Sequence, residues 1–269
     1  MDGKRILAAG GDIRMLYAAK ELSKLSDKLD VEITGFSPEK VSDDEKEILK
    51  AFSDTGKEAD ILLLPHLVTD SKGRFNAPFS EKEIDISDLL KRVKKGGAVF
   101  LGIKGEKVID AAKENSLYHY KYMEDEVLAL ANAVPTAEGA IKIIIEETGR
   151  TIWDSNILVT GYGKIGSVLT DRLIKMGANV TTAARKEYDR MRIKTSGGRA
   201  AGIKPDEEVL SEAEVIVNTV PARIFGEKEF SCMKKGSVYI ELASAPFGGD
   251  KKDAEKYNIK YVCASGLPA

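Results

Sequence analysis

The sequence predicts an α/β protein made of two doubly wound domains, each built on a mostly parallel sheet, with a cleft between them. Three observations support this prediction. Strand-like and helix-like segments alternate through both halves of the chain, a glycine-rich turn at 161–166 joins a strand to a helix, and Pro135 interrupts a helical stretch between the halves. Such alternation is typical of parallel sheets that are covered by helices on both faces. The 269 residues are enough for two domains of about 130 residues each.

The first half, residues 1–132, is expected to form a flavodoxin-like domain. Short apolar runs predict its buried strands, and apolar residues that recur every three or four positions predict its helices. The expected strands are 5–9, 31–36, 61–64, 97–101 and 117–120, and the expected helices are 13–25, 43–52 and 105–114.

A hinge between the domains is expected at about 123–150. Two helices are predicted there, 123–132 and 136–147, because Pro135 disfavours a helical conformation at the residue before it. Thr136 can cap the helix that would begin after it. The cleft beside such a hinge is where ligands normally bind.

The second half, residues 133–269, repeats the alternation and is expected to form the other domain. The expected strands are 156–160, 179–184, 214–218, 237–242 and 260–264, and the expected helices are 164–176, 186–194 and 250–257. The chain stops at Ala269, directly after the last strand and without a closing helix. Either the fold ends there or a further segment is missing.

The glycine-rich turn of the second half has the spacing GxGxxG and lies between a predicted strand and a predicted helix. It consists of Gly161, Tyr162, Gly163, Lys164, Ile165 and Gly166. In a dinucleotide-binding Rossmann domain the first glycine allows a tight turn, the second lets the pyrophosphate approach the backbone, and the third lets helix and sheet pack closely. Unpaired N–H groups at the helix start then face the phosphates. The sequence therefore predicts a bound NAD(P); the alternative is a glycine-rich packing turn in a Rossmann domain that binds no cofactor.

The end of the next strand indicates which dinucleotide is bound. NAD-binding domains usually place Asp or Glu about 20 residues after the glycines, where it binds the ribose 2′-hydroxyl, and NADP-binding domains accommodate a 2′-phosphate with an arginine. Here the strand ends in Ala184, Arg185 and Lys186, with no acid. An arginine can bind a phosphate through two parallel hydrogen bonds. We therefore expect NADP(H) rather than NAD(H), unless Arg185 and Lys186 belong to a solvated loop and the protein accepts either cofactor.

A second glycine turn, at 10–14, joins a strand to a helix in the first half. It lacks the GxGxxG spacing, so it does not predict a dinucleotide site. A helix start still attracts anions, and Arg14 would add a cation beside the backbone of Gly11. We expect this turn to bind a substrate carboxylate. In the alternative interpretation Asp12 caps the helix and Arg14 is a surface residue.

Further candidates lie at the ends of other strands, where open α/β sheets bind their ligands. His66 follows a strand of the first half and could act as a general acid or base, or be a hydrogen-bonded loop residue. Ser244 follows the strand 237–242 and is a candidate substrate ligand. The candidates beside the ribose and nicotinamide of the cofactor are Thr219, Val220 and Pro221.

Composition argues against several classes of protein. The net charge of −2 gives no basic excess for nucleic acid, no apolar run approaches the roughly 18 residues of a membrane span, and the first residues lack a signal segment. These observations predict a cytoplasmic protein. With two cysteines, no CxxC and two histidines, no metal site is expected.

Several segments together resemble the family of the dipicolinate synthase A subunit, from endospore-forming bacteria. The most specific are Gly-Gly-Asp-Ile-Arg at 10–14 and Asn-Ala-Val-Pro-Thr-Ala-Glu-Gly at 132–139. The other matching segments are 161–166, 177–180, 184–185, 218–221, 242–244 with Pro246, and 266–268. The resemblance covers essentially the whole chain.

The resemblance implies an NADP-linked oxidoreductase that converts dihydrodipicolinate to dipicolinate and works with a second, flavoprotein-like subunit. The substrate is a small dicarboxylate, so cations and helix starts should bind it, and Arg14, Gly11 and Thr136 are candidates. The candidate proton acceptors are His66, Glu138 and Asp12. The sequence does not choose among them, nor does it decide whether the chain forms a homo-oligomer. Family members continue past the segment 266–268 with a tail that includes a helix, and this chain does not.

Two other classes of function remain as alternatives. A 2-hydroxy-acid dehydrogenase has the same two-domain layout but typically uses a catalytic histidine late in the chain, and no histidine follows His119. An alanine-dehydrogenase-like or homocysteine-hydrolase-like enzyme also fits the layout. A non-catalytic NADP(H) sensor usually carries a DNA-binding or membrane module, for which the sequence gives no sign.

Overall fold

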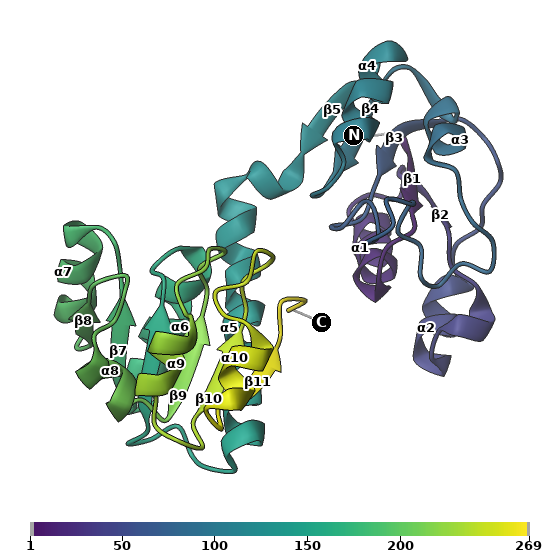
Figure 1. Ribbon diagram of the computed structural model, residues 1–269. Helices are drawn as coiled ribbons and strands as arrows, with labels where there is room; N and C mark the ends of the chain where they lie inside the picture. Colours follow the sequence, from purple (N-terminus) through teal and green to yellow (C-terminus); the bar gives the residue numbers. More distant parts are fainter. Residues whose placement is uncertain (1–2, 268–269) are drawn as a thin grey trace. The chain divides into compact units, whose positions relative to one another are not determined.

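The computed structural model describes residues 3–267 and divides into two compact units, Met1–Glu126 and Val127–Ala269. Each unit has its own parallel sheet (Figure 1). The boundary at Glu126 precedes the one expected at 132. The end of the chain at Pro268 and Ala269, where a further segment is expected, lies outside the described residues.

The first unit is built on five parallel strands in the order β2-β1-β3-β4-β5, which is the flavodoxin-like order. Its strands are β1 (Arg5–Ala9), β2 (Asp30–Thr34), β3 (Ala59–Leu63), β4 (Val93–Leu101) and β5 (Tyr118–Lys121). Its helices are α1 (Ile13–Lys24), α2 (Asp43–Leu49), α3 (Ile86–Lys91) and α4 (Glu106–Glu114), with 3₁₀ turns at Pro38–Lys40 and Tyr122–Glu124.

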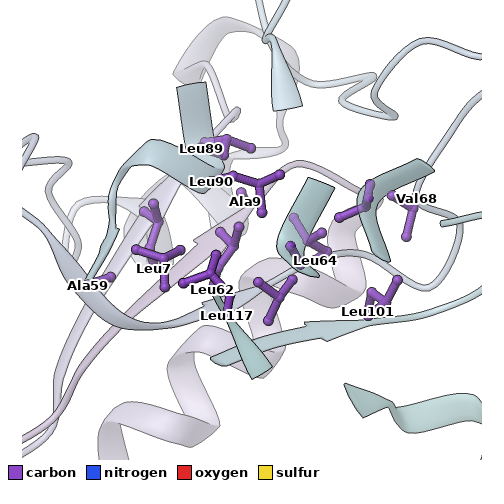
Figure 2. Packing of buried hydrophobic residues seen from close by; sticks show 14 of the residues in the cluster. Leu7, Ala9, Ala59, Leu62, Leu64, Val68, Leu89, Leu90, Leu101 and Leu117 are labelled. Carbon is purple, nitrogen blue, oxygen red and sulfur yellow. The ribbon is translucent and has the colours of Figure 1, made fainter. Parts of the chain in front are cut away.

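Apolar side chains cover both faces of this sheet. Leu7 and Leu62 lie on one face and pack with Leu90 of α3 (Figure 2). On the other face Ala8 packs with Leu16 of α1. Successive residues of a strand point to opposite faces, so a strand with helices on both sides must be apolar at every position. This requirement explains why the strands were recognisable as uninterrupted apolar runs.

The second unit has six parallel strands in the order β11-β10-β9-β6-β7-β8. With β6 counted as the first strand, this is the order of a dinucleotide-binding Rossmann sheet. Its strands are β6 (Asn156–Thr160), β7 (Asn179–Ala183), β8 (Arg199–Ala201), β9 (Val215–Asn218), β10 (Val238–Glu241) and β11 (Lys260–Cys263). Its helices are α5 (Glu126–Thr148), α6 (Lys164–Lys175), α7 (Glu187–Thr195), α8 (Glu207–Glu212), α9 (Glu227–Cys232) and α10 (Lys251–Lys256).

The continuous helix α5 replaces the two helices that were expected on either side of Pro135. The predicted break was wrong, because the packing of a 23-residue helix offsets the single backbone hydrogen bond that an internal proline removes. Ala140 and Ile144, on the buried face of α5, contribute to the core of the second unit.

The same helix corrects the expectation that no apolar stretch has the length of a membrane span. Within the described part of the chain, α5 alone is long and apolar enough to cross a membrane, with a mean hydropathy of 1.4. The core helix of a globular domain meets the same criterion, and α5 packs one face into such a core. Two helices separated at Pro135, 123–132 and 136–147, would each be too short to meet this criterion.

Every expected strand is present, with ends shifted by a few residues. Apart from the 3₁₀ turns, four elements were not expected: α3, β8, α8 and α9. Helices of six residues and a strand of three are too short to show a periodic pattern in the sequence.

Candidate functional site

The carboxyl ends of β6 and β9 meet where the strand order of the second sheet reverses. β6 pairs with β7 on one side and with β9 on the other. The turn 161–166 follows β6 and the segment 219–221 follows β9, so both lie at this switch point. Ligands of open α/β sheets bind at such a point.

Each glycine of the turn occupies a different steric environment. Gly161 has a φ of +95°, and a side chain there would overlap the hydroxyl of Thr219. A Cβ on Gly166 would overlap the carbonyl oxygen of Gly161. A Cβ on Gly163 would meet no other atom within 4 Å, so the space beside the helix start is not filled by the protein. These are the three environments that a pyrophosphate-binding Rossmann turn requires.

The start of α6 is suited to an anion. Its N-cap is Gly163, which has no side chain to satisfy the first N–H groups, and no acid occupies the first turn. The first turn of a helix leaves its N–H groups without intrahelical acceptors, and the helix dipole adds a positive potential. The residues present therefore fit the pyrophosphate of a dinucleotide.

A buried hydrogen-bond network lies at the base of this site. Asn218 accepts a hydrogen bond from the hydroxyl of Thr160 at 2.7 Å and donates one to the carboxylate of Glu241 at 2.6 Å. Glu241 also accepts from the hydroxyl of Tyr239 at 3.0 Å and from two N–H groups of the following loop. The network ties the ends of β6, β9 and β10 together. Sequence reasoning missed the role of Glu241, although an acid at the end of an apolar strand was a visible signal.

The end of β7 carries no acid. Ala184 is buried, and its N–H donates to the carbonyl of Ala201 on β8 at 3.0 Å. Arg185 and Lys186 are exposed, and within residues 3–267 neither forms an ion pair. The two cations are therefore available to an external anion.

In the first unit the strand order reverses between β1 and β3, and the turn 10–14 and His66 follow these strands. Gly11 does not have the role expected of it. Its N–H donates to the carbonyl of Asn76 at 2.7 Å, so it is not available to a substrate carboxylate. Asn76 lies far from Gly11 in the sequence, so no local sequence pattern predicts this hydrogen bond.

Asp12 caps α1 and also binds Arg14. Asp12 Oδ1 accepts from the N–H of Arg14 at 3.1 Å, and the carboxylate accepts two hydrogen bonds from the guanidinium, at 2.9 and 2.6 Å. These bonds hold the pKa of Asp12 below its ordinary value, although burial opposes the shift. Asp12 thus caps the helix, as the alternative interpretation expected. Arg14, however, forms an ion pair with Asp12 and is not simply a surface residue. A carboxylate with a lowered pKa is a poor proton acceptor.

His66 and Tyr122 lie in the electrostatic field of this ion pair. Burial and the charge of Arg14 lower the pKa of His66, and Asp12 opposes them. The imidazole is therefore neutral at neutral pH. Burial raises the pKa of Tyr122, whose hydroxyl donates to the carbonyl of Leu64 at 3.1 Å. Tyr122 was not among the expected site residues, although it lies two residues after the strand predicted at 117–120.

The remaining candidates have other surroundings. Glu138 is exposed on α5 and pairs with Arg172 of α6 at 3.4 Å, roughly 12 Å along α6 from its start. Thr136 was expected to cap a helix start, but it lies inside the continuous helix α5 and caps none. It is buried, and its hydroxyl donates to the carbonyl of Asn132 at 2.9 Å. Ser244 is exposed on the loop that follows β10.

Two family models match the two units. Residues 5–123 match the N-terminal domain of the dipicolinate synthase A subunit, and residues 131–248 match the NAD binding domain of the D-isomer specific 2-hydroxyacid dehydrogenases. The second match supports a dinucleotide-binding domain and an oxidoreductase-type fold.

Comparisons over the whole chain agree with the first match. The chain is 29% identical to the dipicolinate synthase A subunit of Bacillus subtilis (strain 168) over 271 positions, which cover 100% of this chain and 90% of that protein. The crystal structure of this synthase component from Bacillus subtilis has a TM-score of 0.81 at 28% identity, covering 98% of this chain and 88% of that one. The corresponding crystal structure from Bacillus halodurans has a TM-score of 0.81 at 27% identity, covering 97% of this chain and 89% of that one. The resemblance and the fold, two parallel-sheet α/β domains with a Rossmann-type second domain, are thereby confirmed.

Proposed function

We propose that this chain, which resembles the dipicolinate synthase A subunit along its whole length, is the NADP(H)-binding component of an enzyme that oxidises dihydrodipicolinate to dipicolinate. The observation that carries the proposal is a glycine turn with an uncapped helix start, followed at the next strand by two cations that have no ion-pair partner within residues 3–267. The family model supports the dinucleotide, and the choice of NADP(H) rests on Arg185 and Lys186.

The proposed reaction removes a hydride and a proton from the dihydropyridine ring. Oxidised nicotinamide, when bound, supplies the hydride acceptor, and the proton goes to a base, so the products are dipicolinate, NADPH and a proton. Aromatisation of the ring provides much of the driving force. The demand on the protein is therefore mainly to orient the donor carbon and to hold the two carboxylates.

In the first unit we assign the proton acceptor to His66 and a carboxylate contact to Arg14. His66 has a lowered pKa and is neutral at neutral pH, so it can accept a proton, whereas the hydrogen bonds from Arg14 make Asp12 a poor base. The side chain of Arg14 is 41% exposed despite its ion pair, so part of its donor fork stays accessible to an anion.

The relatives are components of dipicolinate synthase by name, so we propose that the chain works with a second, flavoprotein-like subunit and is cytoplasmic. The decisive test has two steps. Calorimetric titration should detect NADPH binding to the folded chain, and dihydrodipicolinate should then reduce NADP⁺ in the presence of both subunits. NADPH binding without any turnover would favour the sensor, and turnover of a 2-hydroxy acid instead would favour that class of dehydrogenase.

The substrate contact is tested separately by Arg14→Ala. We expect the KM for the dicarboxylate to rise by roughly ten-fold or more, which is the range for one charge-assisted hydrogen bond, while NADPH affinity stays the same. An unchanged KM would remove Arg14 from the site.

A further inference from the structure

One arginine of α7 lies against the glycine turn. The guanidinium carbon of Arg192 is 5.6 Å from the centroid of the Tyr162 ring. A cation within about 6 Å of an aromatic ring centroid is attracted to the ring face. Tyr162 follows β6, whereas α7 follows the neighbouring strand β7. The contact between Arg192 and Tyr162 therefore joins the helix after β7 to the glycine turn after β6.

A second arginine fixes α7 to the end of β7. Arg190 donates to the carbonyl oxygens of Ala184 at 3.0 Å and Arg185 at 2.9 Å, and it also pairs with Glu187. These bonds hold the first turn of α7 against the strand end. They also fix the backbone of Arg185 relative to α7.

Three cations in this region have no acidic partner in the described part of the chain. Arg185, Lys186 and Arg192 are exposed, and none of them forms an ion pair with any of the residues from 3 to 267. Arg190, by contrast, is neutralised by Glu187. Arg185 and Lys186 follow the end of the second Rossmann strand, where the 2′-phosphate of NADP(H) is recognised, and Arg192 lies on the helix that begins directly after them.

We propose that Arg192, positioned by the ring of Tyr162, is a further ligand of the 2′-phosphate and shares with Arg185 the discrimination of NADP(H) from NAD(H). A phosphate has three acceptor oxygens and carries close to two negative charges, so it can accept hydrogen bonds from more than one guanidinium. The inference rests on the proposed function and adds a specificity residue to it. Tyr162 acts through Arg192 and does not itself bind the phosphate.

The experiment measures the affinity of the full chain for NADPH and for NADH by calorimetry. Arg192→Ala should weaken NADPH binding by roughly ten- to a hundred-fold, the range for a hydrogen bond to a charged group, and leave NADH binding nearly unchanged. Lys194→Ala is the matched control, because it removes one exposed positive charge from the same helix without a contact to Tyr162. We expect its affinity for both cofactors to match the original chain.

The positioning role of Tyr162 has its own comparison. Tyr162→Phe keeps the ring face and should keep the preference for NADPH, whereas Tyr162→Leu removes the ring and should lose part of that preference. Equal behaviour of the two variants would overturn the positioning role.

Two results would overturn the inference while leaving the proposed function intact. The first is unchanged NADPH binding by Arg192→Ala, and the second is an equal loss for NADPH and NADH, which would mean that Arg192 contacts the adenine instead. Arg192→Lys serves as a second variant, since it keeps the charge and loses the planar fork; we expect an intermediate preference. If the original chain binds neither reduced cofactor, the proposed function itself fails.

Discussion

Arg14 and Arg185 illustrate how differently two arginines near strand-to-helix turns can be used. Arg14 makes two side-chain hydrogen bonds to Asp12, whereas Arg185 is exposed and has no acidic partner within the described chain. An anion that binds Arg14 must share it with a carboxylate already in place. An anion at Arg185 meets no such competition, so we expect the larger electrostatic effect there.

Arg185→Asp should therefore weaken NADPH binding far more than NADH binding. The substitution replaces a cation by an anion that repels the 2′-phosphate and can accept a hydrogen bond from a 2′-hydroxyl. Titration with both cofactors measures the change. An equal loss of affinity for the two would show that Arg185 does not contact the 2′-phosphate.

His66 leads to a prediction about pH. Its pKa is lowered from 6.5 by burial and by Arg14, so the unfolded chain binds more protons than the folded one just below pH 6.5. Stability contributed by the neutral imidazole is complete above pH 6.5 and falls as the pH is lowered toward the folded pKa. Denaturant unfolding between pH 7.5 and 5 should show this decline in the original chain and a smaller one in His66→Gln.

The same shift applies to the proposed proton transfer. The acid limb of kcat/KM should have an apparent pKa below 6.5, and Arg14→Ala should move it to higher pH, because a cation that lowers the pKa of His66 is removed. The chain has only two histidines, so NMR titration with His119→Gln for assignment measures this pKa directly. A His66 pKa at or above 6.5 would contradict the prediction.

At the scale of the elements, helices α5 and α6 each contain a glycine, and the two differ in whether the surroundings can accept a side chain there. A Cβ on Gly139 of α5 would come within 3.0 Å of the end of the Leu267 side chain, which can move, whereas a Cβ on Gly166 of α6 would overlap the backbone oxygen of Gly161. The preceding peptide unit, between Thr160 and Gly161, is fixed by a hydrogen bond from the N–H of Gly161 to the carbonyl of Ala183 at 2.9 Å, which restricts movement of the turn.

Gly139→Ala should consequently stabilise the protein by about 0.5–1 kcal/mol, the usual gain in a helix interior, or be neutral if Leu267 resists. Gly166→Ala should destabilise it by about 1–3 kcal/mol through overpacking and should weaken NADPH binding. Denaturant unfolding and cofactor titration of the two variants provide the comparison. Equal stability of the two variants would mean that the glycine turn 161–166 can move to accept the added methyl group.

At the scale of the whole molecule, each unit has a complete hydrophobic core. Among residues 3–267, the clusters on both faces of the first sheet involve only residues of the first unit, and those of the second sheet only residues of the second. All the proposed cofactor ligands also belong to the second unit. The two units are therefore expected to be separable in folding and in cofactor binding.

A fragment of residues 127–269 should fold and should bind NADPH in preference to NADH, as the full chain does. Circular dichroism measures the folding and calorimetry the binding. A folded fragment that does not bind NADPH would show that the first unit contributes to the cofactor site.

The amino-acid sequence alone determined the fold class, the glycine turn and the absence of an acid at the end of β7. These features depend on residues close together in the chain, on apolar periodicity and on backbone conformations that only glycine adopts readily. The candidates His66 and Arg185 were also found in this way, from their positions after predicted strands.

Only the tertiary structure decided which polar groups are paired and which remain available. Gly11 gives its N–H to Asn76, Glu241 joins three strand ends, and Arg192 lies on Tyr162. It also decided that α5 continues through Pro135, since the packing of its buried face outweighs a local preference. The physical reason is common to all four: hydrogen-bond partners and packing neighbours come from distant parts of the chain, so they exist only once the sheets have assembled.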